Sequence, residues 1–250
     1  MGKLRIGLSI TLMIAVLVVG AGSAMAAPLK TNLFGLDGLF IATSGKVIPA
    51  GTMLVSSSVL IVSDDNVDGT TVPVSFTYGA SSDIEVAAAF EVYKSFDNGA
   101  QDDTGTGDLF LSAKYAILEA NADYPATALG LRLKLPMADD PLGTEETDFA
   151  IFAAMEMAMK SVTAMLNVEY LMPGGNAENQ VNYVVGLQIP YSDTTDFSLE
   201  LMDNDLVGDL FAGGATFDMG SALNFGVALG FGLNDFSADF AALGKLTFTF

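Results

Sequence analysis

The stretch Ala128-Leu-Gly-Leu-Arg-Leu-Lys-Leu135 decides the fold. Leucine stands at every second position, and the residues between the leucines are Gly130, Arg132 and Lys134. Successive side chains of a β-strand point to opposite faces, so this strand has one apolar face and one small or charged face. The leucine face suits lipid, and the opposite face suits water.

The same alternation recurs along most of the chain and predicts an all-β protein. A closed, antiparallel, up-and-down transmembrane β-barrel explains why apolar residues are dispersed in this way, with a small, polar inward face. We expect about twelve strands; ten stay possible because Gly208 to Asp218 alternates poorly. The expected strands are 51–63, 70–79, 82–94, 107–119, 125–136, 147–159, 161–171, 180–190, 194–203, 207–218, 221–233 and 239–250.

The connections between these strands alternate in length. The first, third, fifth and seventh are long and polar, whereas those that follow the even-numbered strands are mostly tight turns. A barrel with both termini in the periplasm has this asymmetry, because its outer loops are long and its periplasmic turns short. The alternative is a soluble β-sandwich or a water-soluble barrel, whose core would carry bulky side chains on the inward face.

The N-terminal residues resemble a secretory signal. Two basic residues, Lys3 and Arg5, precede an apolar run from 6 to 19 and the small-residue stretch Ala24-Met25-Ala26. Cleavage is expected after Ala26. The predicted organisation is therefore a signal peptide (1–26), a periplasmic or plug segment (27–48) and the barrel (49–250).

Charge and composition exclude several functions. Without the signal the chain keeps 8 basic and 30 acidic residues, a net charge of −22, which argues against nucleic acid as a partner. The chain has no His and no Cys. Histidine-based catalysis, Ser-His-Asp chemistry and ordinary zinc sites are therefore excluded. We expect no enzyme activity, no cofactor and no metal site.

The predicted outer loops are acidic. Asp64 to Gly69 matches the first half of a calcium loop, but position twelve of the motif is Ser75 instead of Glu and a strand follows. A solvated hairpin loop is the simpler interpretation. Divalent cations could join such loops to lipopolysaccharide phosphates, so outer-membrane lipids and lipopolysaccharide are expected partners.

Six charged residues are candidates for the lining of a pore. By parity, Lys114, Arg132 and Lys134 point into the barrel from two neighbouring strands, and Glu85, Glu91 and Glu156 point inward from the strands on either side. One interpretation is an internal ion-pair network that rigidifies the barrel. The other is a constriction whose charges bias what passes.

The chain ends on Leu246-Thr-Phe-Thr-Phe250, with apolar residues at every second position. This ending resembles the C-terminal signal that the bacterial barrel-assembly machinery reads, and Phe248 and Phe250 would carry it. The machinery is therefore an expected partner, and the bacterial outer membrane the expected location.

Several hairpin stretches resemble an outer-membrane transporter family named for the meta-pathway of phenol degradation. The residues that carry the resemblance are Pro49-Ala-Gly-Thr52, Tyr78-Gly79, Ser82-Asp-Ile-Glu85, Gly107-Asp-Leu109, Lys114-Tyr115 and Leu133-Lys-Leu-Pro136. The resemblance implies a porin-like channel for passive or facilitated passage of small solutes, aromatic or apolar molecules among them. The alternative is a structural or adhesive barrel with a closed lumen.

Overall fold

The computed structural model describes residues 29–64, 67–121, 124–204, 208–220, 222–234 and 237–250. The signal peptide expected at 1–26 lies outside these residues. Within the described part of the chain, no helix is long and apolar enough to cross a membrane.

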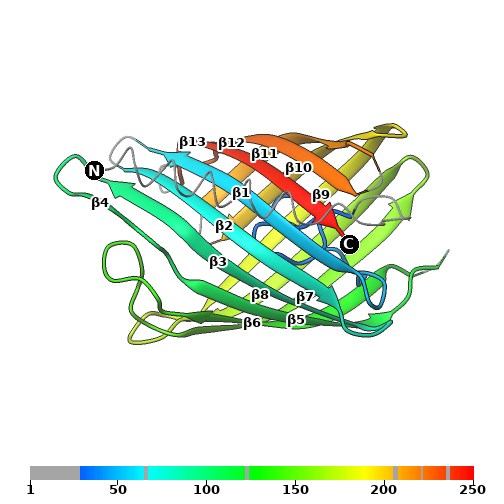
Figure 1. Cartoon of the computed structure of the whole chain (residues 1–250), viewed down its shortest axis with the longest axis horizontal. Helices are drawn as coiled ribbons and strands as arrows, with labels where there is room; N and C mark the ends of the chain where they lie inside the picture. The colour runs from blue at the N-terminus through cyan, green and yellow to red at the C-terminus, as the bar shows by residue number, and fades with distance from the viewer. Residues whose placement is uncertain (1–28, 65–66, 122–123, 205–207, 221, 235–236) are drawn as a thin grey trace.

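Twelve antiparallel strands form one closed barrel, and a short thirteenth strand lies outside the ring (Figure 1). Closure comes from the pairing of the first strand with the last, which joins Leu54 to Thr249 and Ser63 to Phe240. The prediction of an all-β barrel with about twelve strands is confirmed. The strands are β1 (Met53–Ser63), β2 (Asp68–Gly79), β3 (Ile84–Asp97), β4 (Asp102–Gly105), β5 (Leu109–Leu118), β6 (Ala126–Leu135), β7 (Asp148–Met159), β8 (Val162–Met172), β9 (Gln180–Ser192), β10 (Thr195–Asn204), β11 (Gly208–Asp218), β12 (Leu223–Gly232) and β13 (Phe240–Thr249).

The extra strand β4 is a correction to the expected loop between 95 and 106. Strand β3 continues to Asp97, and the chain then folds back so that β4 pairs with the end of β3. Gly99 allows the turn, with φ at 75°. This hairpin projects from the end of the barrel opposite the C-terminus (Figure 1). We call that end the loop end and the other the turn end.

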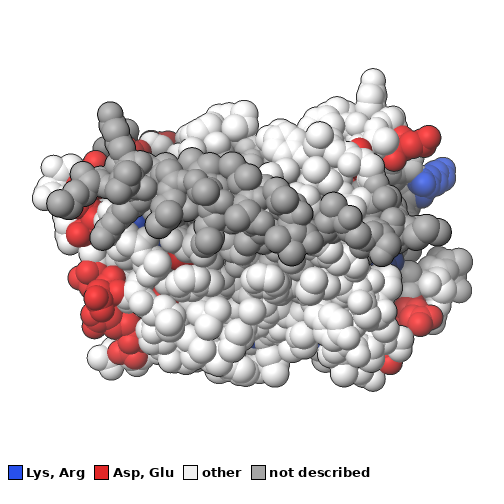
Figure 2. Space-filling view, viewed as in Figure 1, with Lys and Arg blue, Asp and Glu red and all other residues white. Residues whose placement is uncertain are grey.

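The outward face of the barrel is apolar. Leu129 and Leu131 are about half exposed, as are aliphatic and aromatic side chains at alternate positions of the other strands. Figure 2 shows that carboxylates gather at the ends of the barrel, whereas the side between them carries almost none. A soluble protein rarely exposes so large an apolar surface, but a membrane-spanning barrel requires it.

The inward face differs between two sides of the barrel. On strands β3 to β8 it carries mainly charged and small residues, as expected, together with the larger Phe110, Phe152 and Met165. On β1, β10, β11 and β13 it also carries buried aliphatic side chains: Leu60, Met202, Leu210 and Leu243. The expectation of a small, polar inward face is therefore wrong on this side. These side chains pack in one apolar cluster with Leu39, Phe40 and Ile41, which come from inside the barrel.

Residues 29–48, which we call the inner segment, lie inside the barrel (Figure 1). They form two small loops closed by bridges between Thr31 and Asp37 and between Gly38 and Thr43. Most of the segment is buried. The chain then passes Gly51 and enters β1 at the turn end.

Candidate functional site

Charged side chains of the barrel wall hold the backbone of the inner segment. Glu200, on β10, is 1% exposed and accepts hydrogen bonds from the amides of Phe40, Ile41 and Ala42 at 3.1, 2.9 and 2.8 Å. Lys245, on β13, donates to the carbonyl oxygens of Thr31 and Leu39. Buried charges are tolerated when their hydrogen-bonding capacity is met, and here the backbone of the segment meets it.

Phe40 anchors the segment on the apolar side. Its ring lies over two glycines of the wall, where a Cβ atom would come within 2.4 Å of the ring at Gly214 and 3.1 Å at Gly226. The glycines therefore provide the room that the ring occupies.

The opposite side of the interior holds the segment through a charged cluster. Glu85 and Lys114 are fully buried and form an ion pair with an N–O distance of 3.3 Å. Glu85 also accepts hydrogen bonds from the amides of Asp37 and Ile48, at 2.8 and 3.0 Å. Lys114 donates to the carbonyl oxygen of Ser44 at 3.2 Å. Both charged groups are therefore satisfied only in part by one another and otherwise by the segment.

Asp37 of the segment faces this cluster. Burial raises the pKa of the Asp37 carboxyl to about 7; Lys114 opposes the shift, and the negative charges of Glu85 and Glu156 add to it. Glu156 itself accepts hydrogen bonds from the hydroxyl of Ser44 and the ammonium group of Lys46. Asp37 and Glu85 thus both interact with the buried ammonium group of Lys114.

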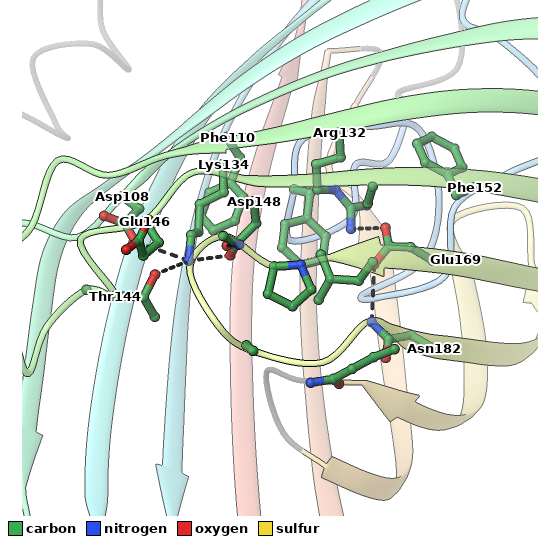
Figure 3. A pocket seen from close by; sticks show the side chains of 18 of the residues that line it. Asp108, Phe110, Arg132, Lys134, Thr144, Glu146, Asp148, Phe152, Glu169 and Asn182 are labelled. Carbon is green, nitrogen blue, oxygen red and sulfur yellow. Dashed lines mark hydrogen bonds and ion pairs between the residues drawn. The ribbon is translucent and has the colours of Figure 1, made fainter.

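A cavity of about 720 Å³ opens above the inner segment on the charged side of the barrel, towards the loop end (Figure 3). Phe34, Ile41 and Thr43 of the segment form part of its lining. The wall contributes aromatic side chains, among them Phe110 and Phe152, together with polar ones. A cavity of this size and mixed character can hold a small molecule.

Ion pairs join the basic side chains of the cavity to carboxylates (Figure 3). Arg132 pairs with Glu169 at 2.5 Å, and Lys134 pairs with Asp148. The guanidinium carbon of Arg132 lies 3.9 Å from the ring centroid of Phe34, a cation–π contact. The Nζ atom of Lys94 lies 3.5 Å from the Oε2 atom of Glu91, near the open end of the cavity.

The six predicted pore-lining residues divide into two groups. Glu91, Arg132 and Lys134 line the cavity. Glu85, Lys114 and Glu156 lie under the inner segment and bind it. The alternation along β3, β5, β6 and β7 correctly predicted that these side chains point inward. It could not predict that the inner segment covers three of them.

Sequence reasoning missed several wall residues that bind the segment. Among them are Glu200, Lys245 and Asn167. The side-chain amide of Asn167 accepts a hydrogen bond from the N–H of Thr43 at 2.6 Å and donates one to its carbonyl at 2.7 Å. Their inward positions follow from the alternation of β8, β10 and β13. Nothing in those strands distinguishes a residue that binds a peptide backbone from one that faces water.

The remaining candidate residues lie away from the cavity. The amide of Phe250 donates to the carbonyl of Met53 at 2.8 Å and closes the seam between β13 and β1. Phe248 lies on the outward face of β13. Two residues of the calcium-like motif, Asp65 and Asn66, are outside the described part of the chain. Among the described residues no group of three or more acidic side chains could hold a metal ion.

Sequence comparison finds no relative. No family model matches the chain. No curated protein matches it.

Solved structures with a similar fold are outer-membrane proteins. The COG4313 outer membrane channel from Pseudomonas putida F1 has a TM-score of 0.62 at 14% identity, over 82% of this chain and 97% of that one. The KdgM porin has a TM-score of 0.54 at 8% identity, over 79% of this chain and 99% of that one. The same porin with disordered oligogalacturonate also has a TM-score of 0.54, at 8% identity over 80% and 99%. The chain therefore has the porin-like fold of the bacterial outer-membrane β-barrels.

Proposed function

We propose that the protein is an outer-membrane channel that passes small molecules and is entered from the loop end. The observation that carries this proposal is the cavity of about 720 Å³ inside a closed barrel, bounded by the wall and by the inner segment. Its aromatic and polar lining suits small organic solutes, aromatic or apolar molecules among them. The fold shared with the COG4313 channel and the KdgM porin supports the same function.

The finer family assignment is also a proposal. The hairpin motifs that resemble the meta-pathway phenol family lie between Pro49 and Pro136, on β1 to β6 and in the connections beside these strands. They support a distant relationship to that family.

The cavity offers a direct test with adjacent residues as variant and control. Ala150 points into the cavity and is 1% exposed, whereas Ile151 points to lipid. Ala150→Phe should fill part of the cavity and slow solute entry, and Ile151→Phe should leave entry unchanged. Swelling of proteoliposomes in solutes of increasing size measures this. Equal rates for the two variants, or no permeation by the wild type, would contradict the proposal.

One observation favours the structural barrel with a closed lumen. The inner segment packs tightly between the charged and apolar sides of the interior. Such a barrel would conduct no solute in any variant. The proteoliposome experiment therefore separates the two functions.

We propose that Arg132 and Lys134 act as selectivity residues within the cavity. Exchanging both for Glu replaces two positive charges with two negative ones, a net change of −4, and should move ion selectivity towards cations. Reversal potentials across a salt gradient measure the change. An unshifted potential in a folded, conducting variant would leave these residues a structural role only.

Assembly and location complete the proposal. Phe248 and Phe250 would be read by the barrel-assembly machinery, and the acidic loops would meet lipopolysaccharide through divalent cations. Deleting Phe250 should lower the amount of heat-modifiable, folded barrel in outer-membrane fractions, whereas Phe240→Leu on the same strand should not. Equal amounts of folded barrel in the two variants would contradict a role of Phe250 in assembly.

A further inference from the structure

The lining of the cavity at the loop end carries more carboxylates than basic groups. Among the described residues, five acidic side chains line it, against the three basic ones Lys94, Arg132 and Lys134. The lining therefore has an excess of two formal negative charges. Inside a barrel such an excess is screened less than on an open surface, so it acts on the charge of any solute that enters.

The guanidinium group of Arg132 is already occupied on two sides. It forms an ion pair with Glu169, and its face lies 3.9 Å from the ring centroid of Phe34. Glu169 is held in turn by the side-chain amide of Asn182, at 3.3 Å. An anionic solute would have to displace Glu169 to bind this group.

The two lysines of the lining are also paired. Lys134 forms an ion pair with Asp148, and it donates a hydrogen bond to the hydroxyl of Thr144 at 2.6 Å (Figure 3). Lys94 lies 3.5 Å from Glu91. The cavity thus offers an anion no basic group that is free of a carboxylate partner among the residues that the structure describes.

One carboxylate of the lining differs from the other four. Within the described part of the chain, Glu146 forms no ion pair, whereas even Asp108 has Lys134 at 4.0 Å. Glu146 is exposed and lies beside Gly174 and Gly175, where an added Cβ atom would come within 2.8 and 3.2 Å of its side chain. A cationic solute can therefore approach this carboxylate without breaking an ion pair.

The surface around the open end of the cavity has the same sign. The connections between strands at the loop end contain no lysine or arginine. Figure 2 shows carboxylates gathered at this end of the barrel. Exposed ones in these connections and in the β3–β4 hairpin are Asp97, Asp102, Asp139, Asp140, Glu145 and Glu178. A surface of one sign raises the local concentration of solutes of the opposite sign.

The uncharged part of the lining is largely apolar. The wall contributes Phe110 and Phe152, and the connection between β6 and β7 contributes Leu142. Ile41 of the inner segment also lines the cavity and belongs to the apolar cluster with Phe40, so the floor of the cavity is continuous with the packed interior. Such a surface binds the hydrocarbon part of a solute, while a few charged groups fix its orientation.

We propose that the cavity selects small organic cations, in which an ammonium group is joined to an apolar body, over anions of the same size. The ammonium group is attracted by Glu146 and by the excess negative charge of the lining. The apolar body packs against side chains such as Phe110 and Leu142. This proposal rests on the proposed channel function and names its class of substrate.

Two probes of similar size test the sign of the preferred charge. Benzyltrimethylammonium and benzenesulfonate each carry a fixed charge on a phenyl ring, so neither crosses the bilayer as a neutral molecule. Reversal potentials across gradients of benzyltrimethylammonium chloride and of sodium benzenesulfonate give their permeabilities. We expect the cation to be at least about tenfold more permeant than the anion. Calorimetric titration of the folded protein in detergent measures binding of each probe separately.

Two adjacent glutamates provide the variant and its control. Glu146→Gln and Glu145→Gln change the net charge of the protein equally, but only Glu146 lines the cavity. Both side chains are exposed, and heat modifiability checks that both barrels fold. Glu146→Gln should lower the ratio of cation to anion permeability about threefold, and Glu145→Gln should leave it near the wild-type value.

The outcomes distinguish the class of substrate from the channel itself. A ratio near one, or a preference for benzenesulfonate, in a conducting wild type would overturn the cation selectivity while the channel stands. An equal loss in both variants would also overturn it, because the exposed surface would then set the preference. If the wild type does not conduct, the channel function fails and the titration decides. Binding of the cation that Glu146→Gln alone weakens supports the site, and absence of binding overturns it.

Discussion

On one side of the barrel interior the inner segment rests mainly on apolar side chains, with Glu200 and Lys245 among them, and on the other it is held mainly by ion pairs and hydrogen bonds. Phe40 lies among Leu60, Met202, Leu210 and Leu243 on the first side. Asp37 lies beside Glu85 and Lys114 on the second. Burial of apolar surface does not depend on pH, whereas the charged contacts do. The comparison teaches that one segment can be fixed by shape on one side and tuned by charge on the other.

The largest effect is expected at the apolar anchor. Phe40→Ala should weaken docking of the inner segment by about 4 kcal/mol, because a buried aromatic ring is lost and a cavity remains over Gly214 and Gly226. Hydrogen exchange of the segment amides measures the change. Phe34→Ala, at a half-buried ring beside the cavity, serves as the comparison and should cost less than half as much. Equal costs would mean that the two sides do not differ as described.

The charged anchor should respond to loss of its buried cation. Lys114→Met leaves Glu85 buried without its ion-pair partner. The substitution should lower the stability of the docked inner segment by about 3 kcal/mol. Lys46→Met removes a half-exposed ammonium group that pairs with Glu156 and should cost less than about 1 kcal/mol. Urea unfolding in detergent, followed by tryptic cleavage of the segment, measures both. If Lys46→Met lost more stability than Lys114→Met, the exposed ion pair with Glu156 would stabilise the docked segment more than the buried pair does, against this prediction.

The fit of Phe40 can be tested with two adjacent glycines. Gly214→Ala places a Cβ 2.4 Å from the ring and 2.8 Å from the carbonyl oxygen of Val227, and it should displace the ring at a cost of about 2 kcal/mol. Gly213→Ala, on the opposite face of β11, meets Leu199 at 3.6 Å and the carbonyl oxygen of Ser198 at 4.0 Å, both ordinary contacts, and should leave docking of the segment unchanged. If the segment amides exchange at the same rate in both variants, the ring of Phe40 can shift without weakening the docking of the segment, and the prediction is wrong.

The pH response is the most gradual effect: through Asp37, docking of the inner segment changes by at most about 1.4 kcal/mol per pH unit. The pKa of Asp37 is about 7 in the docked segment and returns to its ordinary value near 4 when the segment is released into water. The contribution of Asp37 to docking is therefore fully present below about pH 4 and is lost by up to about tenfold per unit between pH 4 and 7.

Segment exchange, corrected for the intrinsic pH dependence of amide exchange, measures this profile. The groups that face Asp37 are Glu85, Lys114, Glu156 and Lys245, and they remain unchanged in Asp37→Asn. That variant should give a flat profile over the same range. A profile that keeps its slope would assign the pH dependence to another group.

The sequence by itself determined the wall of this protein. Alternation such as Leu129 to Leu135 specifies which side chains face lipid, and strand pairing then follows because every backbone group in a membrane needs a partner. The strand number and the inward direction of Lys114 and Arg132 could be read from the same rule. Alternation depends only on residues that are neighbours in the chain, so it can be recognised in the sequence without the structure.

Only the tertiary structure decided what lies inside the wall. Residues 29–48 have no strand period, and their position depends on contacts with Glu85, Asn167, Glu200 and Lys245, which are 37 to 214 residues away in the chain. The bulky inward residues of β1, β10, β11 and β13 make sense only against Phe40. Such contacts join side chains of the wall to the backbone of a segment far away in the sequence. The local sequence around neither partner predicts the contact.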